Sequence, residues 1–152
     1  MRIRRAALIF WVPPVLWMVV IFSASGDSAS VAHSSRLFEP LMRWLFPWLA
    51  QARIEEIHCL FRKCMHLAEF SILALLLWLA IRRTHLTTDC RWLWSQAGQA
   101  LAIVALYAAS DEFHQTFVPG RNGQISDVLV DTIGGGIGLG LLWLAGRIFK
   151  RW

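Results

Sequence analysis

The sequence predicts an all-α membrane protein, with four transmembrane helices in a single integral membrane domain. The chain of 152 residues is 57% hydrophobic and only 16% charged, with a mean hydropathy of +0.49, a balance that would keep few soluble domains of this size in solution. Four apolar runs each approach the ~20 residues that a spanning helix needs, and no alternating strand pattern accompanies them. These runs are residues 6–22, 64–81, 95–110 and 128–149.

The first run has a second interpretation as a secretory signal. Arg2, Arg4 and Arg5 precede it, and the small residues "SAS" follow it. The run is longer than the ~7–15 residues of a signal core, and it carries Trp11 and Trp17. We therefore predict an uncleaved anchor, whereas cleavage would leave three spans.

The distribution of Lys and Arg predicts that both termini are cytoplasmic. Nine of these residues fall on the side of the termini and six on the other, which favours a multi-pass protein of the cytoplasmic (inner) membrane in that orientation. Of the ten acidic residues, only Asp89 falls on the cytoplasmic side. The pI of about 9.9 therefore follows from topology and attraction to anionic lipid, and nucleic acid is not an expected partner.

The longest connection, residues 24–63, predicts an amphipathic or re-entrant segment between the first two spans. Apolar side chains recur there at helical spacing: Leu37, Leu41, Trp44, Leu45 and Trp48. Because proline interrupts helices, Pro40 and Pro47 should divide the segment into two short helices. We expect it to lie at headgroup depth or, alternatively, to pack on the mouth of the bundle without touching lipid.

The last run contains the glycine-rich stretch "GGGIGLG". Gly134 and Gly138, and likewise Gly136 and Gly140, are four residues apart, a spacing that lets helices approach closely in lipid. A nucleotide-binding loop is not favoured, since it would need a preceding strand in a soluble βαβ unit.

Three clusters of polar and ionisable side chains fall at one expected membrane surface, and within each cluster the side chains, apart from Lys63, share one face of a helix. They are Arg62, Lys63, His66 and Glu69 before and within the second run, Asp111, His114 and Gln115 after the third, and Asp127 and Asp131 at the start of the fourth. A charge at membrane depth costs about 2.5–3.5 kcal/mol on insertion scales, so these groups should face one another around a cavity.

The loop "VPGRNGQ" joins the third and fourth runs and holds Arg121 between two glycines. Its backbone amides and the guanidinium would suit an anion, because a planar fork donates two parallel hydrogen bonds to phosphate. The alternative is a loop arginine that reaches the interface without a ligand.

These motifs resemble the VanZ-like family of small bacterial membrane proteins. The resemblance rests on "RKCMHLAEF", on "DEFHQTFVPGRNGQISDVLVDTIGG" and on "IFSASG". The family takes its name from an accessory protein of glycopeptide-antibiotic resistance. A remote kinship proposed with lipid headgroup enzymes of the phosphatidylserine synthase type implies an active site lined by His66, Glu69, Asp111, Glu112, His114, Arg121 and Asp127.

The leading interpretation is a protein that binds, and transforms by phosphodiester transfer or hydrolysis, the headgroup of a phospholipid or lipid-linked envelope precursor on the extracytoplasmic side. His66 or His114 would be the base, with Glu69, Asp111 and Glu112 as further catalytic groups. The substrate would be bound by Arg62, Lys63, Gln115, Arg121 and Asp127. Asp111, Asp127 and Asp131 offer the oxygen ligands that Ca²⁺ or Mg²⁺ prefers, as a possible cofactor.

Two other classes of function compete with this interpretation. A non-catalytic binder would sequester a glycopeptide antibiotic or shield its lipid target with the same pocket. Ion or proton transport would need polar groups along a complete path, and inward of Glu69 and Asp131 the runs contain no buried charge. No oligomeric state follows from the sequence.

Overall fold

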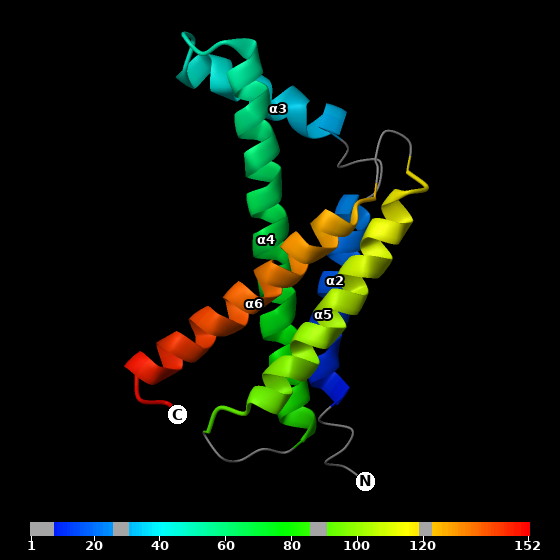
Figure 1. Ribbon diagram of the computed structural model, residues 1–152, viewed down its shortest axis with the longest axis vertical. Helices are drawn as coiled ribbons and strands as arrows, with labels where there is room; N and C mark the ends of the chain where they lie inside the picture. Colours follow the sequence, from blue (N-terminus) through cyan, green and yellow to red (C-terminus); the bar gives the residue numbers. More distant parts are fainter. Residues whose placement is uncertain (1–7, 26–30, 86–90, 119–122) are drawn as a thin grey trace.

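The fold is known from a computed structural model, which describes residues 8–25, 31–85, 91–118 and 123–152 (Figure 1). Within these ranges the chain is helical and forms no strand, which confirms the all-α prediction. The elements are η1 (Ile9–Trp11), α2 (Val12–Ser25), α3 (Val31–Leu45), α4 (Gln51–Thr84), α5 (Trp94–Gln115) and α6 (Ile125–Ile148).

Two of the described helices, α4 and α6, are long and apolar enough to cross a membrane, judged by length and composition. The apolar stretch Ile9–Ser25, which contains η1 and α2, is shorter. Within the described residues, the four runs expected to span thus fall on η1 with α2, on α4, on α5 and on α6, and a membrane crossing by α2 and α5 stays a prediction.

The core forms where α2, α5 and α6 pack against the second half of α4. Along α4 the buried side chains Phe70, Leu73, Ala74, Leu77 and Ile81 recur every three or four residues, the spacing of one helix face. The facing residues of α5 are small, namely Ala97, Ala100, Val104 and Ala108. Large apolar side chains also line an outer face of α6, at Leu129, Ile133, Ile137 and Leu141, each about half exposed or more. A helix that is apolar on both faces suits a bilayer.

Helix α6 crosses α4 diagonally at a backbone-to-backbone contact (Figure 1). A Cβ atom at Gly134 would lie 2.7 Å from the Leu67 carbonyl oxygen, and one at Gly138 would lie 2.8 Å from that of Ser71. The Ser71 hydroxyl donates across the crossing to the Gly134 carbonyl oxygen at 2.6 Å. The predicted close packing is therefore confirmed for Gly134 and Gly138.

The second glycine pair does not take part in this crossing. Cβ atoms at Gly136 and Gly140 would meet nothing within 4 Å, because these residues lie on the far side of α6 from α4. The prediction that both pairs pack against a helix is wrong for this pair among the described residues.

The segment before α4 differs from the prediction. Helix α3 contains Pro40 in its interior and continues to Leu45, so Pro40 does not divide it into two. Helix α4 then begins at Gln51, well before the expected span at residue 64, so that α3 and the first part of α4 form an arm at the top of Figure 1. Apolar and charged residues alternate along the arm, so the first part of α4 is not a continuous apolar run. Hydropathy alone therefore does not predict it as a helix.

The apolar side chains of α3 and of the turn after it fall into a packed group and an exposed group. Phe38 packs on His58 and Phe61 in the first part of α4, with ring centroids 4.9 and 5.3 Å apart, and so within the arm rather than on the mouth of the bundle. Trp44 and Trp48, however, are 78% and 77% exposed. Their contact with a lipid interface stays a prediction.

The crossing predicts unequal tolerance of alanine at two neighbouring glycines. Gly134→Ala should lower the free energy of unfolding by about 1–3 kcal/mol, because its Cβ would overlap the α4 backbone. Gly136→Ala has open space and should be neutral or stabilising by up to about 1 kcal/mol, since alanine favours the helix. Unfolding of the two purified variants in mixed micelles measures the difference. Equal stabilities would contradict the close crossing.

Candidate functional site

Polar side chains from four helices meet above the hydrophobic core. The end of α2, the end of α5 and the first turns of α6 lie together on one side of α4 at this level (Figure 1). Five of these polar residues are at most 6% exposed: Ser25, Asp111, Glu112, Gln115 and Asp131. Such burial is unusual for three carboxylates, so their partners decide what the site can do.

Asp111 links α2 to α5. Its Oδ2 accepts hydrogen bonds from the Ser25 hydroxyl at 2.8 Å and from the Gln115 amide at 3.0 Å. Its Oδ1 is buried and has no hydrogen-bond partner within the described structure. A buried acceptor of this kind favours a ligand that can donate a hydrogen bond.

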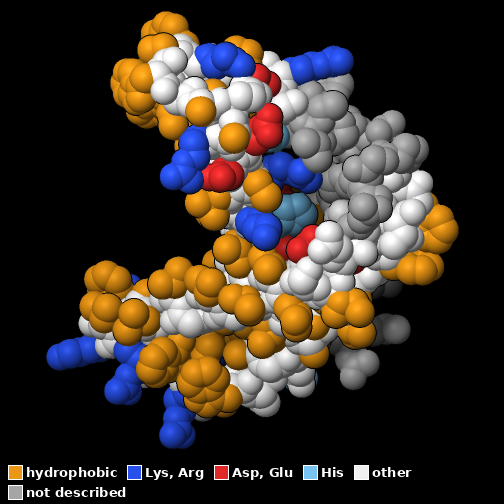
Figure 2. All heavy atoms as spheres, turned by 45° about the horizontal axis from the view of Figure 1, so that its top comes forward, with side chains coloured by type: hydrophobic (Ala, Val, Ile, Leu, Met, Phe, Trp, Pro, Cys, Tyr) orange, Lys and Arg blue, Asp and Glu red, His pale blue; other side chains and the backbone are white. Residues whose placement is uncertain are grey.

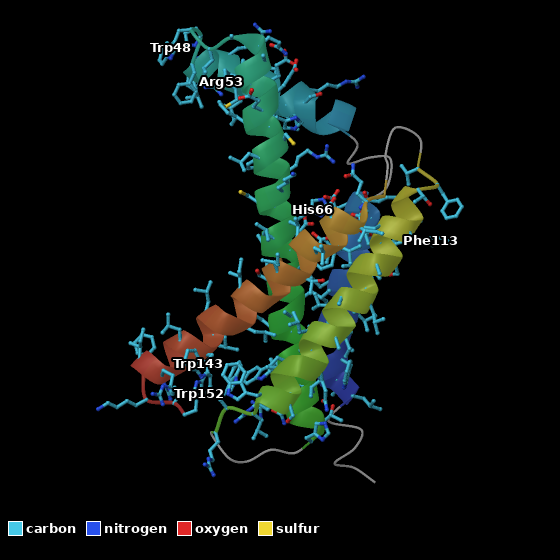
Figure 3. The ribbon with its side chains drawn as sticks, in the orientation of Figure 1. Trp48, Arg53, His66, Phe113, Trp143 and Trp152 are labelled. Carbon is cyan, nitrogen blue, oxygen red and sulfur yellow. The ribbon has the colours of Figure 1, made fainter. Side chains whose placement is uncertain are left out.

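His66 and Asp131 bring α4 and α6 together. His66 Nδ1 lies 3.4 Å from Asp131 Oδ1, and the side chains are 24% and 1% exposed, respectively. The pair is an ion pair when the imidazole is protonated. With Nδ1 facing a carboxylate, Nε2 is left as the nitrogen that can take a proton. Figure 3 shows His66 beside the first turns of α6, above the point where α6 crosses α4.

Glu112 holds the end of the loop between α5 and α6. Its Oε2 accepts a hydrogen bond from the Gln124 backbone N–H at 3.0 Å. Gly123 lies so close to the Glu112 carbonyl that a side chain there would overlap it. Burial raises the pKa of the Glu112 carboxyl, which lies beyond the predicted third span, so its protonated form persists to higher pH than usual.

Two further acidic residues surround the His66–Asp131 pair. Glu69, one turn along α4, is half-buried and within electrostatic range of His66. Asp127, in the first turn of α6, is half-buried, and its negative charge repels those of the Glu112 and Asp131 carboxylates. The carboxylates therefore form one electrostatic group.

The other predicted residues are less uniformly placed. His114 is half-buried and packs on Phe22, with the two ring centroids 4.3 Å apart and the ring planes tilted by 35°. Its Nδ1 is buried and has no hydrogen-bond partner in the described part of the chain. Arg62 is half-buried and Lys63 exposed, both on α4 above His66.

Burial and the nearby Arg62 guanidinium lower the pKa of His58, which lies outside the predicted spans. Arg121 lies outside the described residues.

The site differs from the sequence prediction in three respects. The carboxylate that contacts His66 is Asp131, for which the sequence predicts an inward-facing position and a role as metal ligand but not the role of partner to the base. Ser25 was not selected, although "IFSASG" places serines at the correct membrane surface. Among the described residues, no group of three or more His, Cys, Asp and Glu side chains is arranged to hold a metal ion, so the suggested metal site at Asp111, Asp127 and Asp131 has no support in this geometry.

Figure 2 shows that the molecule is hollowed between the arm and α6, and that basic, acidic and histidine side chains gather on the inner wall of this hollow. Apolar side chains cover much of the lobe that contains α6 and part of the arm. The arrangement would admit a ligand with an apolar part and a charged head.

A comparison with known protein families matches residues 10–146 to the VanZ/LLP1 family. The chain belongs to the VanZ/LLP1 family. The match contains every candidate site residue and most of the described helices. No curated protein and no solved structure matches the chain significantly. Membership in the VanZ/LLP1 family together with two long apolar helices indicates a membrane protein.

The Ser25–Asp111 contact predicts that one of two nearby serines is structurally important. Ser25→Ala should lower the free energy of unfolding by about 1.5–3 kcal/mol, because it removes a hydrogen bond to a buried carboxylate. Ser23→Ala is the matched control, since the exposed Ser23 hydroxyl bonds only the Val19 carbonyl of its own helix turn. Thermal unfolding of both variants in the same detergent checks this. A Ser25→Ala variant as stable as Ser23→Ala would remove Ser25 from the site.

Proposed function

We propose that the protein binds the headgroup of a phospholipid or lipid-linked cell-envelope precursor at the extracytoplasmic surface and catalyses transfer or hydrolysis at its phosphodiester. The observation that carries this proposal is the contact of His66 Nδ1 with the buried Asp131 carboxylate. A histidine held in this way is a common general base.

The reaction can be written with His66, Asp131 and Glu112. Nε2 of His66 removes the proton from an attacking hydroxyl or water. The oxygen of that hydroxyl or water then forms a new bond to phosphorus. Asp131 stabilises the imidazolium that results. The bond from phosphorus to the leaving alcohol breaks, and this alcohol takes a proton from a carboxylic acid. Glu112 is the best candidate for the acid, because burial favours its protonated form.

The same chemistry needs a cationic clamp for the phosphate. Arg62 and Lys63 on α4, with Arg121 in the loop before α6, are the cations that the motifs supply. Gln115 and Asp127 would contact the rest of the headgroup, and Glu69, Asp111 and His114 would complete the catalytic group. The kinship with phosphatidylserine synthase-type enzymes stays a hypothesis consistent with this assignment.

His66 and Asp131 can be tested with purified protein and a phospholipid substrate. His66→Gln should abolish lipid turnover while lipid binding is retained, and Asp131→Asn should lower kcat by about 10²–10⁴-fold through loss of the oriented base. His85→Gln, at the exposed opposite end of α4, is the control and should keep full turnover. Release of labelled headgroup gives kcat and KM. Full turnover by the His66→Gln variant would eliminate His66 as the base.

A second candidate function is non-catalytic binding that confers glycopeptide resistance. Membership in the VanZ/LLP1 family favours it, since the family is associated with that resistance. A binder would need the polar hollow but no proton transfer, so His66→Gln would then leave resistance of whole cells unchanged. The same variant thus separates the two candidates.

We further propose four transmembrane helices in a bacterial cytoplasmic membrane, with both termini cytoplasmic. An even number of crossings is supported by the fold, because α2 begins and α6 ends at the lower end of Figure 1, opposite the site. The Lys and Arg distribution then sets the orientation.

This topology predicts opposite labelling of two cysteines on intact cells. Cys59, exposed on the arm, should react with an impermeant thiol reagent when it is the single cysteine of the chain. A cysteine in place of the exposed Ser95, at the start of α5, should react after lysis only. Mass spectrometry of the labelled protein measures both. The reverse pattern would place the candidate site in the cytoplasm.

A further inference from the structure

Ser71 of α4 lies at the point where α6 crosses this helix. Its hydroxyl oxygen is 2.6 Å from the Gly134 carbonyl oxygen of α6 and 2.7 Å from the Leu67 carbonyl oxygen of its own helix. A bond to the carbonyl four residues earlier is ordinary for a serine within a helix. The bond to Gly134 is different, because it joins residues 63 positions apart in the sequence. The side chain of Ser71 therefore links the two helices.

The contact between His66 and Asp131 lies about one turn away from this hydrogen bond. Asp131 precedes Gly134 on α6 and His66 precedes Ser71 on α4, so the two interactions occupy successive levels of one helix contact. The backbones are closest at the level of Gly134, and the helices diverge from the crossing toward their ends (Figure 1). The acid and the base thus lie where α4 and α6 begin to separate, and the crossing angle determines how far apart they are.

A small change in the crossing angle would alter this separation. One helical turn is about 5.4 Å, so a rotation of about 10° at the crossing would move a side chain one turn away by about 1 Å. The Nδ1 and Oδ1 atoms of the pair are 3.4 Å apart, already longer than the about 2.7–2.9 Å of a short charged hydrogen bond. A misplacement of about 1 Å can lower the rate of a catalysed reaction by about 10²-fold. A directional hydrogen bond at the crossing opposes such a rotation.

We propose that Ser71 is a positioning residue for the acid–base pair. Its hydrogen bond to Gly134 holds α4 and α6 at the angle at which the Asp131 carboxylate keeps the proton of the neutral His66 ring on Nδ1. Nε2 is then free to act as the base. Ser71 acts through the helices, since the two oxygens that its hydroxyl approaches are backbone carbonyls. The effect on turnover rests on the proposed function, whereas the effect on the imidazole does not.

Nuclear magnetic resonance of the purified full-length chain in micelles tests the positioning role without turnover. With isotope-labelled histidine, the ring nitrogen signals of His66, assigned by their loss in His66→Gln, report which nitrogen carries the proton. We expect mainly the Nδ1–H form in the wild type and a shift toward the Nε2–H form in Ser71→Ala, because the carboxylate is then less well aligned. Thr132→Val is the matched control and should keep the wild-type form. The Thr132 hydroxyl is next to Asp131 in sequence but donates to the Val128 carbonyl of its own helix.

Steady-state kinetics of lipid turnover test the consequence for the reaction. Ser71→Ala should lower kcat about tenfold with little change in KM, because the substitution affects the base and not the binding of substrate. In an Asp131→Asn background the same substitution should have no further effect on kcat, since the contact through which it acts is already lost. Thr132→Val should keep the wild-type kcat.

A wild-type distribution of the His66 proton in Ser71→Ala, or a wild-type kcat, would overturn the proposal. A loss of kcat that is equally large with Asp131 and with Asn at that position would also overturn it, because it would indicate a purely structural effect. Absence of turnover in the wild-type protein would refute the proposed reaction instead. The ring nitrogen signals of His66 would then still decide whether Ser71 positions the pair.

Discussion

The rest of the structure depends on the close crossing of α6 over α4. Gly134 and Gly138 have no side chains at the point of contact, so the two backbones meet and Ser71 bonds directly to the opposite helix. Asp131 lies one turn before Gly134, and His66 directly precedes Leu67, whose carbonyl faces that glycine. The packing that fixes the crossing therefore also fixes the separation of acid and base, and a shift of either helix would change both.

The site contains carboxylates whose burial is unfavourable in free energy and whose oxygens are only partly hydrogen-bonded. Asp111 and Asp131 each direct one oxygen to a protein partner and keep a second, buried oxygen without one in the described structure. Four different helices contribute, so no single helix could hold the arrangement without the others. Trp17 and Tyr107 strengthen the assembly, since their polar atoms donate to backbone carbonyls of α4 and α2, respectively. The folding of the bundle and the placement of the polar groups are in this way one process.

The sequence predicts the helices because long apolar runs indicate segments that avoid water. It predicts that the polar residues gather at one surface of the membrane because a charged side chain is unfavourable within the hydrocarbon layer. It does not predict which carboxylate meets His66, since that depends on the register of the α4–α6 crossing. It also does not predict that α3 continues through Pro40, which removes one backbone hydrogen bond from the helix while the nearby Phe38 packs on α4. It does not predict the role of Ser25 either, because an uncharged hydroxyl can remain near lipid without a specific partner. Arg121 lies outside the described residues, so its role in the site stays a prediction.

The length of α4 links the site to the thickness of the surrounding membrane. The helix has 34 residues and is therefore about 51 Å long, whereas a bilayer's hydrocarbon layer is about 30 Å thick. His66 lies near the start of the apolar run of this helix, residues 64–81, which is about 27 Å long. Where α4 crosses a bilayer, a thicker membrane would draw His66 and Asp131 below the headgroups and dry them, and a thinner one would lift them into water. Hydrophobic mismatch thus acts directly on the hydration of this acid–base pair.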